Sequence, residues 1–268
     1  MELRNPPRGV PRSFRRDERE ALRQLRASGS YLLIIYALLG AALLEWIPVW
    51  LLVLSIPPLY IRCALSGHEL MHIRKASQVP LLHRLMMILE TPVSLGYREH
   101  RDIHMRHHRN PATERDPEFF QIRGGHLRAI LSAMVSPEWS FLHYVREKGL
   151  SRELLLEATL RCGAFIGAAV VNPLAFLAYW ITVRASVGSA AYLFHHALHY
   201  RGGSHGTFTL RPPRALERIL RLVLGREAVM ILLEHPAHHE FPQVKASHLP
   251  DVASCVPRSA ARAEAFAS

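Results

Sequence analysis

Two long apolar segments dominate the pattern of the chain. Residues 31–65 contain only two charged side chains, Glu45 and Arg62, and residues 154–198 are almost as poor in charge. Each segment is too long to be one buried core helix, and turn-forming residues interrupt both near the middle, at 45–48 (EWIP) and at 171–173 (VNP). We therefore expect an all-α integral membrane protein with four transmembrane helices in two hairpins. The alternative is one long tilted span with a buried helix.

The first two spans would have about 16 residues each, at the short end for crossing a bilayer. Eight arginines precede residue 31, whereas neither proposed turn contains Lys or Arg. The positive-inside rule then places the amino end, residues 66–153 and the carboxyl end in the cytoplasm. We expect a basic cytoplasmic segment (1–28), one membrane domain (29–256) and a disordered tail (257–268).

The net charge of +11 and the pI of 10.2 agree with this topology and with anionic lipid as a neighbour. Charge alone would also suit a nucleic-acid binder, but no recognisable nucleic-acid-binding motif accompanies it. We therefore expect no nucleic-acid partner.

Histidines concentrate in four short motifs, HELMH (68–72), HMRHH (104–108), FHHALHY (194–200) and HPAHH (235–239). All four are predicted at the same membrane surface, which forms a helical cap on the cytoplasmic side. In a helix, the three histidines of HMRHH would project from one face, where three nitrogens can hold a metal. Ten of the 17 histidines are candidate metal ligands on this spacing: His68, His72, His104, His107, His108, His195, His199, His235, His238 and His239.

Several kinds of metal site are compatible with these motifs. HELMH matches the HExxH pattern of zinc proteases, in which His68 and His72 would bind zinc and Glu69 would act as base, but this interpretation leaves the other motifs unexplained. One zinc takes about four ligands, so eight or more imidazoles indicate two metals. With no CxxC pair among three cysteines, an all-nitrogen site suits two irons that bind and reduce dioxygen, although zinc could occupy it.

The order HxxxH, HxxHH, a histidine on the fourth span and a final HxxHH resembles that of the membrane fatty acid desaturase and hydroxylase superfamily. The resemblance runs from about Tyr31 to Pro250 and includes RNPATERDPE (109–118) and EHPAHHEFPQVKASHLP (234–250). It implies that the three histidine boxes and His199 bind two irons. The family has an asparagine four positions before the last of these ligands, whereas this chain has His195, which could bind the second iron directly where an amide would act through water. A non-catalytic metal- or haem-binding protein would not explain the match in order.

The resemblance also implies the chemistry. Two irons and dioxygen would take hydrogen from an unactivated carbon of an apolar substrate that arrives from the bilayer. Removal of a second hydrogen gives an alkene, and return of oxygen gives an alcohol. We favour a fatty acyl desaturase; the alternative is a hydroxylase of alkyl chains or a carotenoid hydroxylase or ketolase.

Electrons must come from a separate ferredoxin-like or small haem carrier with its reductase, since the chain has no Gly-rich nucleotide fingerprint, no CxxC motif and no fused haem-domain motif. The basic segment 211–226 has leucines near helical spacing, which predicts an amphipathic helix on the membrane or a docking surface for an acidic carrier.

Arg184 is the remaining charged residue of interest, because it interrupts the fourth span. A charge at mid-membrane is costly unless it pairs or faces water. Either the span begins earlier, so that Arg184 reaches the cytoplasmic interface, or Arg184 binds a polar group of the substrate.

Overall fold

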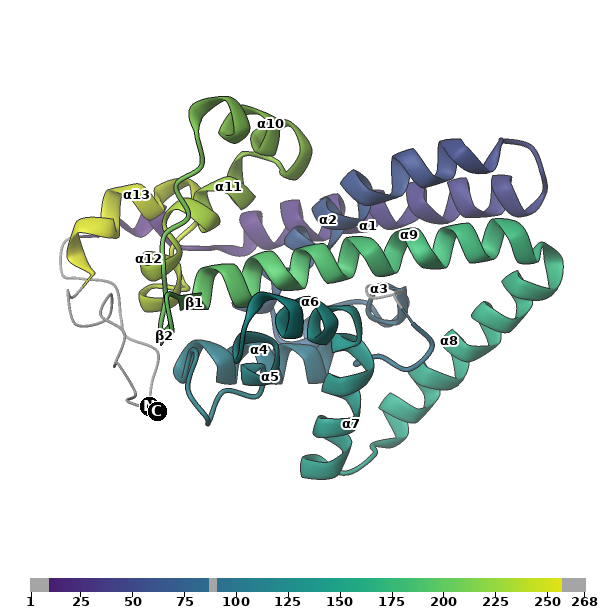
Figure 1. The fold of residues 1–268 in the computed structure, drawn as a ribbon, viewed down its shortest axis with the longest axis horizontal. Helices are drawn as coiled ribbons and strands as arrows, with labels where there is room; N and C mark the ends of the chain where they lie inside the picture. Colours follow the sequence, from purple (N-terminus) through teal and green to yellow (C-terminus); the bar gives the residue numbers. More distant parts are fainter. Residues whose placement is uncertain (1–9, 87–90, 257–268) are drawn as a thin grey trace.

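The computed structural model describes residues 10–86 and 91–256 and is mostly helical (Figure 1). Four helices in this part of the chain are long and apolar enough to cross a membrane. They are α1 (Glu18–Leu43), α2 (Val49–Ile73), α8 (Arg152–Val171) and α9 (Pro173–Ala191), which continues as a π-helical segment, Tyr192–Ala197.

The helix breaks fall where the turn-forming residues predict them. Between α1 and α2 the chain turns at Glu45, whose φ of 60° lies in the left-handed region, and α2 begins directly after Pro48. Between α8 and α9, the side chain of Asn172 accepts a hydrogen bond from the Ala175 N–H at 3.1 Å and so caps α9. In Figure 1 both turns lie at the same end of the molecule, opposite the short helices α10 to α13.

The first two helices are longer than their apolar runs predict. α1 begins at Glu18, where Asp17 caps the helix by accepting from the Glu20 N–H at 2.8 Å, and α2 continues through the first histidine motif to Ile73. Their 26 and 25 residues correspond to roughly 38 Å at ~1.5 Å per residue, more than the ~30 Å of a hydrocarbon core. The polar ends of both helices therefore extend beyond the apolar layer. This places part of the predicted amino-terminal segment inside the folded unit.

The core of the spanning helices is formed by one face of each of α1, α2 and α9. Leu32 and Ile35 of α1 pack with Leu52 and Ile56 of α2 and with Tyr179 of α9. Other apolar side chains of these helices are exposed, such as Leu33, Leu54 and Leu174, and so are Ile166 and Val170 of α8. Apolar residues that face outward on long helices are typical of contact with lipid.

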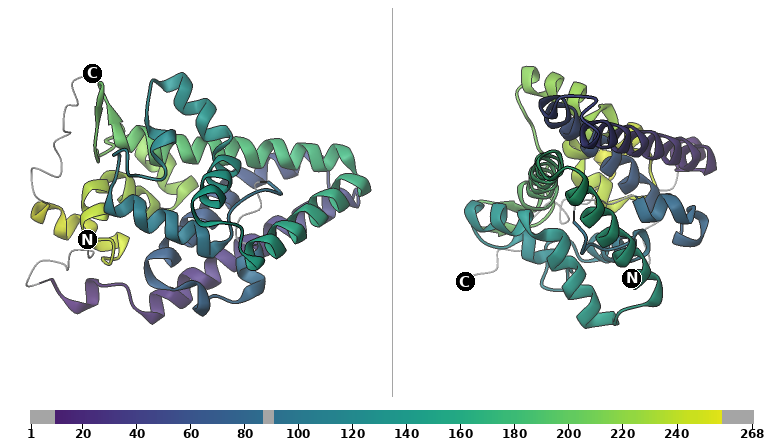
Figure 2. Two further views of the ribbon diagram at one scale, coloured as in Figure 1. Left: turned by 90° about the horizontal axis from the view of Figure 1, so that it is seen from below. Right: turned by 90° about the vertical axis from the view of Figure 1, so that its right-hand side faces the viewer.

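The remaining helices are shorter. One group connects α2 to α8, and a second group follows α9. Those between α2 and α8 are α3 (Leu81–Met86), α4 (Tyr97–Arg109), α5 (Phe119–Ile122), α6 (His126–Met134) and α7 (Ser136–Lys148). After α9 come α10 (Arg214–Leu224), α11 (Arg226–Leu233), α12 (His235–Glu240) and α13 (Leu249–Val252). Figure 2 shows these two groups of helices in two further views.

Helix α10 corresponds to the predicted amphipathic segment, and its side chains Leu216, Ile219 and Leu222 are exposed. The tail predicted to be disordered, 257–268, lies outside the described residues.

A small β-hairpin departs from the all-α expectation. Strands β1 (Tyr200–Arg201) and β2 (Ser204–His205) pair in antiparallel fashion. Gly202 and Gly203 form the two-residue turn between them, with φ values of 55° and 87° that glycine adopts without strain. The hairpin directly follows the histidines at the end of the fourth span, so it determines the direction of the chain after them.

Candidate metal centre

The predicted histidine motifs converge at one place in the fold. HELMH lies on α2, HMRHH on α4, HPAHH on α12, and His195 and His199 lie at the end of the fourth span. Their imidazoles form two adjacent groups, joined where the rings of His108 and His239 stack at 4.3 Å. The three histidines of HMRHH lie on one helix, as their spacing predicts, but they divide between the two groups: His104 and His108 belong to the first group and His107 to the second.

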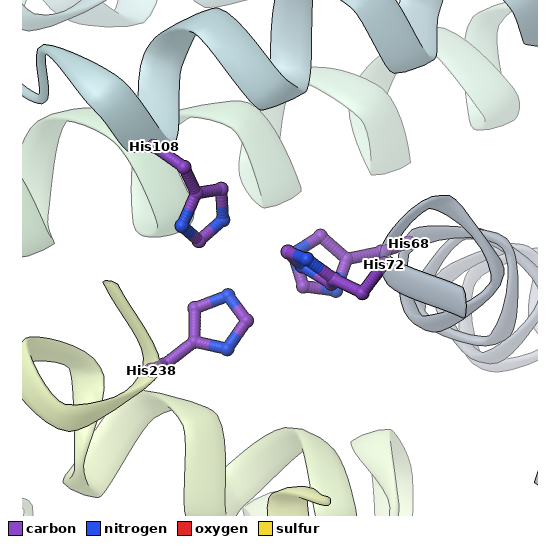
Figure 3. Close-up of side chains that lie close together, drawn as sticks. All are labelled: His68, His72, His108 and His238. Carbon is purple, nitrogen blue, oxygen red and sulfur yellow. The ribbon is translucent and has the colours of Figure 1, made fainter. Parts of the chain in front are cut away.

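The first group combines the histidines of α2 with residues from α4 and α12. Ligand nitrogens of His68, His72, His108 and His238 all lie within 4.8 Å of one another, and the four rings point toward a common centre (Figure 3). His104 completes the group, since its Nε2 lies 3.1 Å from Nε2 of His72. Two nitrogens that bind one metal at right angles are about 3.0 Å apart, so this spacing fits a shared ion.

The second group has the same character and comes from three elements. His107, His199 and His239 place ligand nitrogens within 4.8 Å of one another. Nε2 of His235 lies 3.0 Å from Nε2 of His199, again the spacing expected of two nitrogens on one ion. The rings of His235 and His239 are 4.5 Å apart and contact edge to face.

Outer contacts orient several of these imidazoles from behind. Nδ1 of His107 lies 2.7 Å from Oδ2 of Asp116, and both side chains are buried. Asp116 also accepts hydrogen bonds from the N–H groups of Ala112 and Glu118, each at 2.9 Å, so it folds the loop after α4 as well. Nδ1 of His199 donates to the Gly206 carbonyl at 2.8 Å, just after the β-hairpin. Such contacts leave Nε2 as the atom that faces a metal.

Burial sets the protonation of the imidazoles outside the spanning helices. It lowers the pKa of the His104, His108, His199, His235, His238 and His239 side chains well below 6.5, and the neighbouring imidazoles lower these pKa values further. Neutral imidazole is the form that binds a metal. His107 differs, because the Asp116 carboxylate outweighs the effect of burial and raises the pKa of His107.

A carboxylate that the histidine motifs did not indicate also lies at the centre. Glu118 is buried, and its Oε1 lies 3.6 Å from Nε2 of His195. Its Oε2 is 4.0 Å from Nδ1 of His107, so the three side chains form a further group that could hold a metal. Asp116 and Glu118 both lie in the segment RNPATERDPE, whose only available signal was three acidic residues, Glu114, Asp116 and Glu118, within ten positions of a histidine motif.

A cavity of about 210 Å³ opens beside the imidazoles. Tyr60, Ala64 and Leu65 of α2 line one side, and Val187 and Phe194 from the fourth span line another. His68, His104, His107, His108, His195, His235, His238 and His239 contribute to its wall, as do the polar residues His100, Glu118, Gln121, Ser94, Ser136 and Ser140. The mostly apolar cavity therefore lies directly beside the nitrogens of the candidate metal ligands.

Two residues considered from the sequence, His196 and Arg184, do not line this cavity. His196 is fully buried but faces away, with Nδ1 hydrogen-bonded to the Ile122 carbonyl at 2.9 Å. Arg184 is not among the lining residues, and its Nη2 donates to Oε2 of Glu138 at 3.0 Å and to the carbonyl of Met134. Its role in substrate binding remains a prediction.

The comparison with protein families identifies the class. The model of the family described as fatty acid desaturase matches residues 44–265, which is most of the chain. The protein therefore belongs to the fatty acid desaturase family. Neither the curated proteins nor the solved structures gave a match.

Proposed function

We propose that the protein is a membrane oxidoreductase with two irons that uses dioxygen to insert a double bond into a fatty acyl chain. The observation that carries this proposal is the convergence of nine histidines into two adjacent groups against an apolar cavity, with His195 beside the second group. Membership of the fatty acid desaturase family supports it.

The side chains present fit two metal ions. The first would be held by His68, His72, His104, His108 and His238, and the second by His107, His199, His235 and His239, with His195 and Glu118 beside it. Buried imidazole nitrogens that lack a protein partner, such as those of His108, support this assignment. When bound, two irons would supply the redox chemistry that activates dioxygen for attack on an unactivated C–H bond.

The cavity determines how a substrate would meet these side chains. Its volume of about 210 Å³ is below the ~300–1,000 Å³ of pockets that enclose a drug-sized ligand. It therefore suits a stretch of an alkyl chain whose remainder stays outside. Residues such as Ala64 and Val187 would hold the chain by apolar contact and exclude water, which fixes one carbon near the imidazoles.

The position of Glu69 argues against the zinc protease alternative. A general base must face the water that it activates. Glu69 is buried, is not among the residues that line the cavity, and forms an ion pair with Arg16.

The membrane arrangement that we propose has two hairpins and a cytoplasmic cap. The turns at 44–48 and 172 would lie on the far side of the bilayer, and both chain ends and the metal centre on the cytoplasmic side, because the eight arginines precede the apolar part of α1 and the turns lack basic residues. A cytoplasmic ferredoxin-like or small haem carrier with its reductase would deliver electrons. Exposed apolar and basic side chains on α10 would lie at the membrane interface.

The test of the reaction is the lipid profile of cells that express the protein with a compatible electron donor. We expect acyl chains that are lighter by two hydrogens. Hydroxylated chains without an alkene would assign the alternative reaction, and altered carotenoids beside unchanged acyl chains would contradict the acyl assignment.

The test of the metal centre is iron content after anaerobic loading. We expect two irons per chain in the wild type, and lower iron content with no turnover in His238→Ala and in His107→Ala, which remove one residue from each group. His126→Ala is the matched control, since His126 is exposed and belongs to neither group. A wild-type protein that never holds more than one metal would contradict the proposal.

A further inference from the structure

The amino-terminal segment ahead of α1 reaches the metal centre through one side chain. Residues 14–16 lie beside the segment that follows the fourth histidine motif, HPAHH: Arg15 and Val244 form a β-bridge, the Arg16 N–H donates to the Gln243 carbonyl at 2.9 Å, and the Lys245 N–H donates to the Phe14 carbonyl at 2.9 Å. This pairing fixes the backbone of Arg16 beside the chain that leaves α12, the short helix that holds His238.

The Arg16 side chain then joins two of the histidine motifs. Its Nε donates to the Val244 carbonyl at 3.1 Å, and its Nη1 donates to Oε2 of Glu69 in an ion pair. The two side chains are only 2% and 4% exposed. Glu69 lies on α2 between the first two candidate ligands, so one guanidinium connects the first motif with the chain that leaves the fourth.

Glu69, the partner of Arg16, also contacts His68. Its second oxygen, Oε1, lies 3.3 Å from Nδ1 of His68. A carboxylate behind a ligating imidazole fixes the tautomer and the ring orientation, and it raises the basicity of the nitrogen that faces the metal. A buried carboxylate that lost this guanidinium partner would turn away, and that change would release His68.

We propose that Arg16 is a positioning residue of the first metal site, which acts through Glu69 to hold His68 in its ligating orientation. This inference rests on the proposed function, because it assigns Arg16 to one of the two proposed irons. Neither the histidine pattern nor the family order indicates Arg16, which the sequence presents only as one of eight arginines before the first span.

The test compares Arg16→Gln, Arg16→Lys and Arg15→Gln in the full-length protein purified in detergent. Each is loaded anaerobically with ⁵⁷Fe, and the iron content, the Mössbauer spectrum and the rate of iron release to a chelator are measured. In Arg16→Gln we expect one of the two irons to leave about 10- to 100-fold faster and its quadrupole doublet to change, while the other iron is unaffected. Arg16→Lys should restore part of the retention, since the ammonium group keeps a cation beside Glu69.

The controls separate this inference from the proposed function. Arg15→Gln should match the wild type, because Arg15 is exposed and contributes its backbone to the bridge. Glu69→Gln removes the same contact without loss of volume and should reproduce Arg16→Gln, even if the latter folds poorly. Two irons with wild-type spectra and release rates in both variants would overturn the inference alone. A wild-type protein without two irons would overturn the proposed function and the inference together.

Discussion

Asp116 holds His107 from behind: its Oδ2 lies 2.7 Å from Nδ1 of His107, and neither side chain is more than 4% exposed. The same carboxylate accepts from two backbone N–H groups, so the loop after α4 and the orientation of one candidate ligand depend on a single residue. The two side chains shift each other's pKa. His107 and these N–H groups lower the pKa of Asp116, although burial alone would raise it. A residue outside both groups of imidazoles thus orients one candidate ligand of the second group.

Asp116→Asn should therefore weaken the second metal site selectively. The amide keeps the size of the side chain but removes the charge that fixes the His107 tautomer, and such outer contacts change metal affinity by about 10- to 100-fold. Iron titration and turnover measure the effect. Asp102→Asn is the matched control on α4, the helix that carries His107, because Asp102 is 45% exposed and its ion pair with Arg106 at 3.3 Å lies at the surface. Wild-type iron affinity in Asp116→Asn would show that the contact does not support the site.

Acid should destabilise the protein once its metal has been removed. Burial depresses the pKa values of His104, His108, His199, His235, His238 and His239 in the folded state, so below about pH 6.5 the unfolded chain takes up protons that the folded chain does not. Stability from these residues is present above the unfolded pKa and falls as the pH falls below it. His107, whose pKa is raised, has the opposite effect, but it is one group against six.

The measurement is thermal unfolding of chelator-treated protein in detergent between pH 8 and pH 5. We expect Tm to fall steadily below about pH 6.5 and iron to oppose the fall, because bound metal favours the neutral imidazoles. His238→Asn removes one of the six groups and should reduce the slope. A Tm that is constant or rises toward pH 5 would contradict the burial of neutral imidazoles.

Much of the site could be predicted because each candidate ligand is a histidine within a short histidine-rich motif. His68 and His72, four residues apart on α2, need only a helix to share a face. The division of HMRHH between two groups could not be predicted, because it depends on how α12 and the end of the fourth span approach α4. Asp116 and Glu118 depend on a loop in which Ala112 adopts a φ of 57°, a conformation that its sequence does not indicate.

The fold shows the same limit. The breaks at Pro48 and Asn172 were predictable from local turn chemistry. The start of α1 at Glu18 was not, because polar residues there are stabilised by contacts distant in sequence, such as the ion pair of Arg23 with Glu227. The π-helical segment 192–197 was also unexpected, since a periodicity of 3.6 residues does not anticipate the extra residue that re-aims His195.

Arg184→Leu should lower stability, and its effect on KM distinguishes a purely structural role from contact with the substrate. Arg184 donates to Glu138 at 3.0 Å and to the Met134 carbonyl, and its side chain is 12% exposed, so its removal costs about 1–3 kcal/mol and leaves Glu138 without this cation. Glu138→Leu should lower Tm by a similar few degrees. Tm and KM of both variants are the measurements. A rise in KM in Arg184→Leu that Glu138→Leu does not share would instead support contact between Arg184 and the substrate.

His195→Asn should keep both irons and substantial turnover. His195 lies beside the second group rather than within its closest set of nitrogens, and its Nε2 lies 3.6 Å from Oε1 of Glu118. An amide at this position can still donate to Glu118, and the family resemblance places an asparagine here. His195→Leu removes the polar group at similar volume and should lower turnover, because Glu118 then loses its neighbour. Iron content and turnover of the two variants distinguish the roles: loss of one iron in His195→Asn would make His195 an obligatory ligand, and wild-type turnover in His195→Leu would remove it from the site.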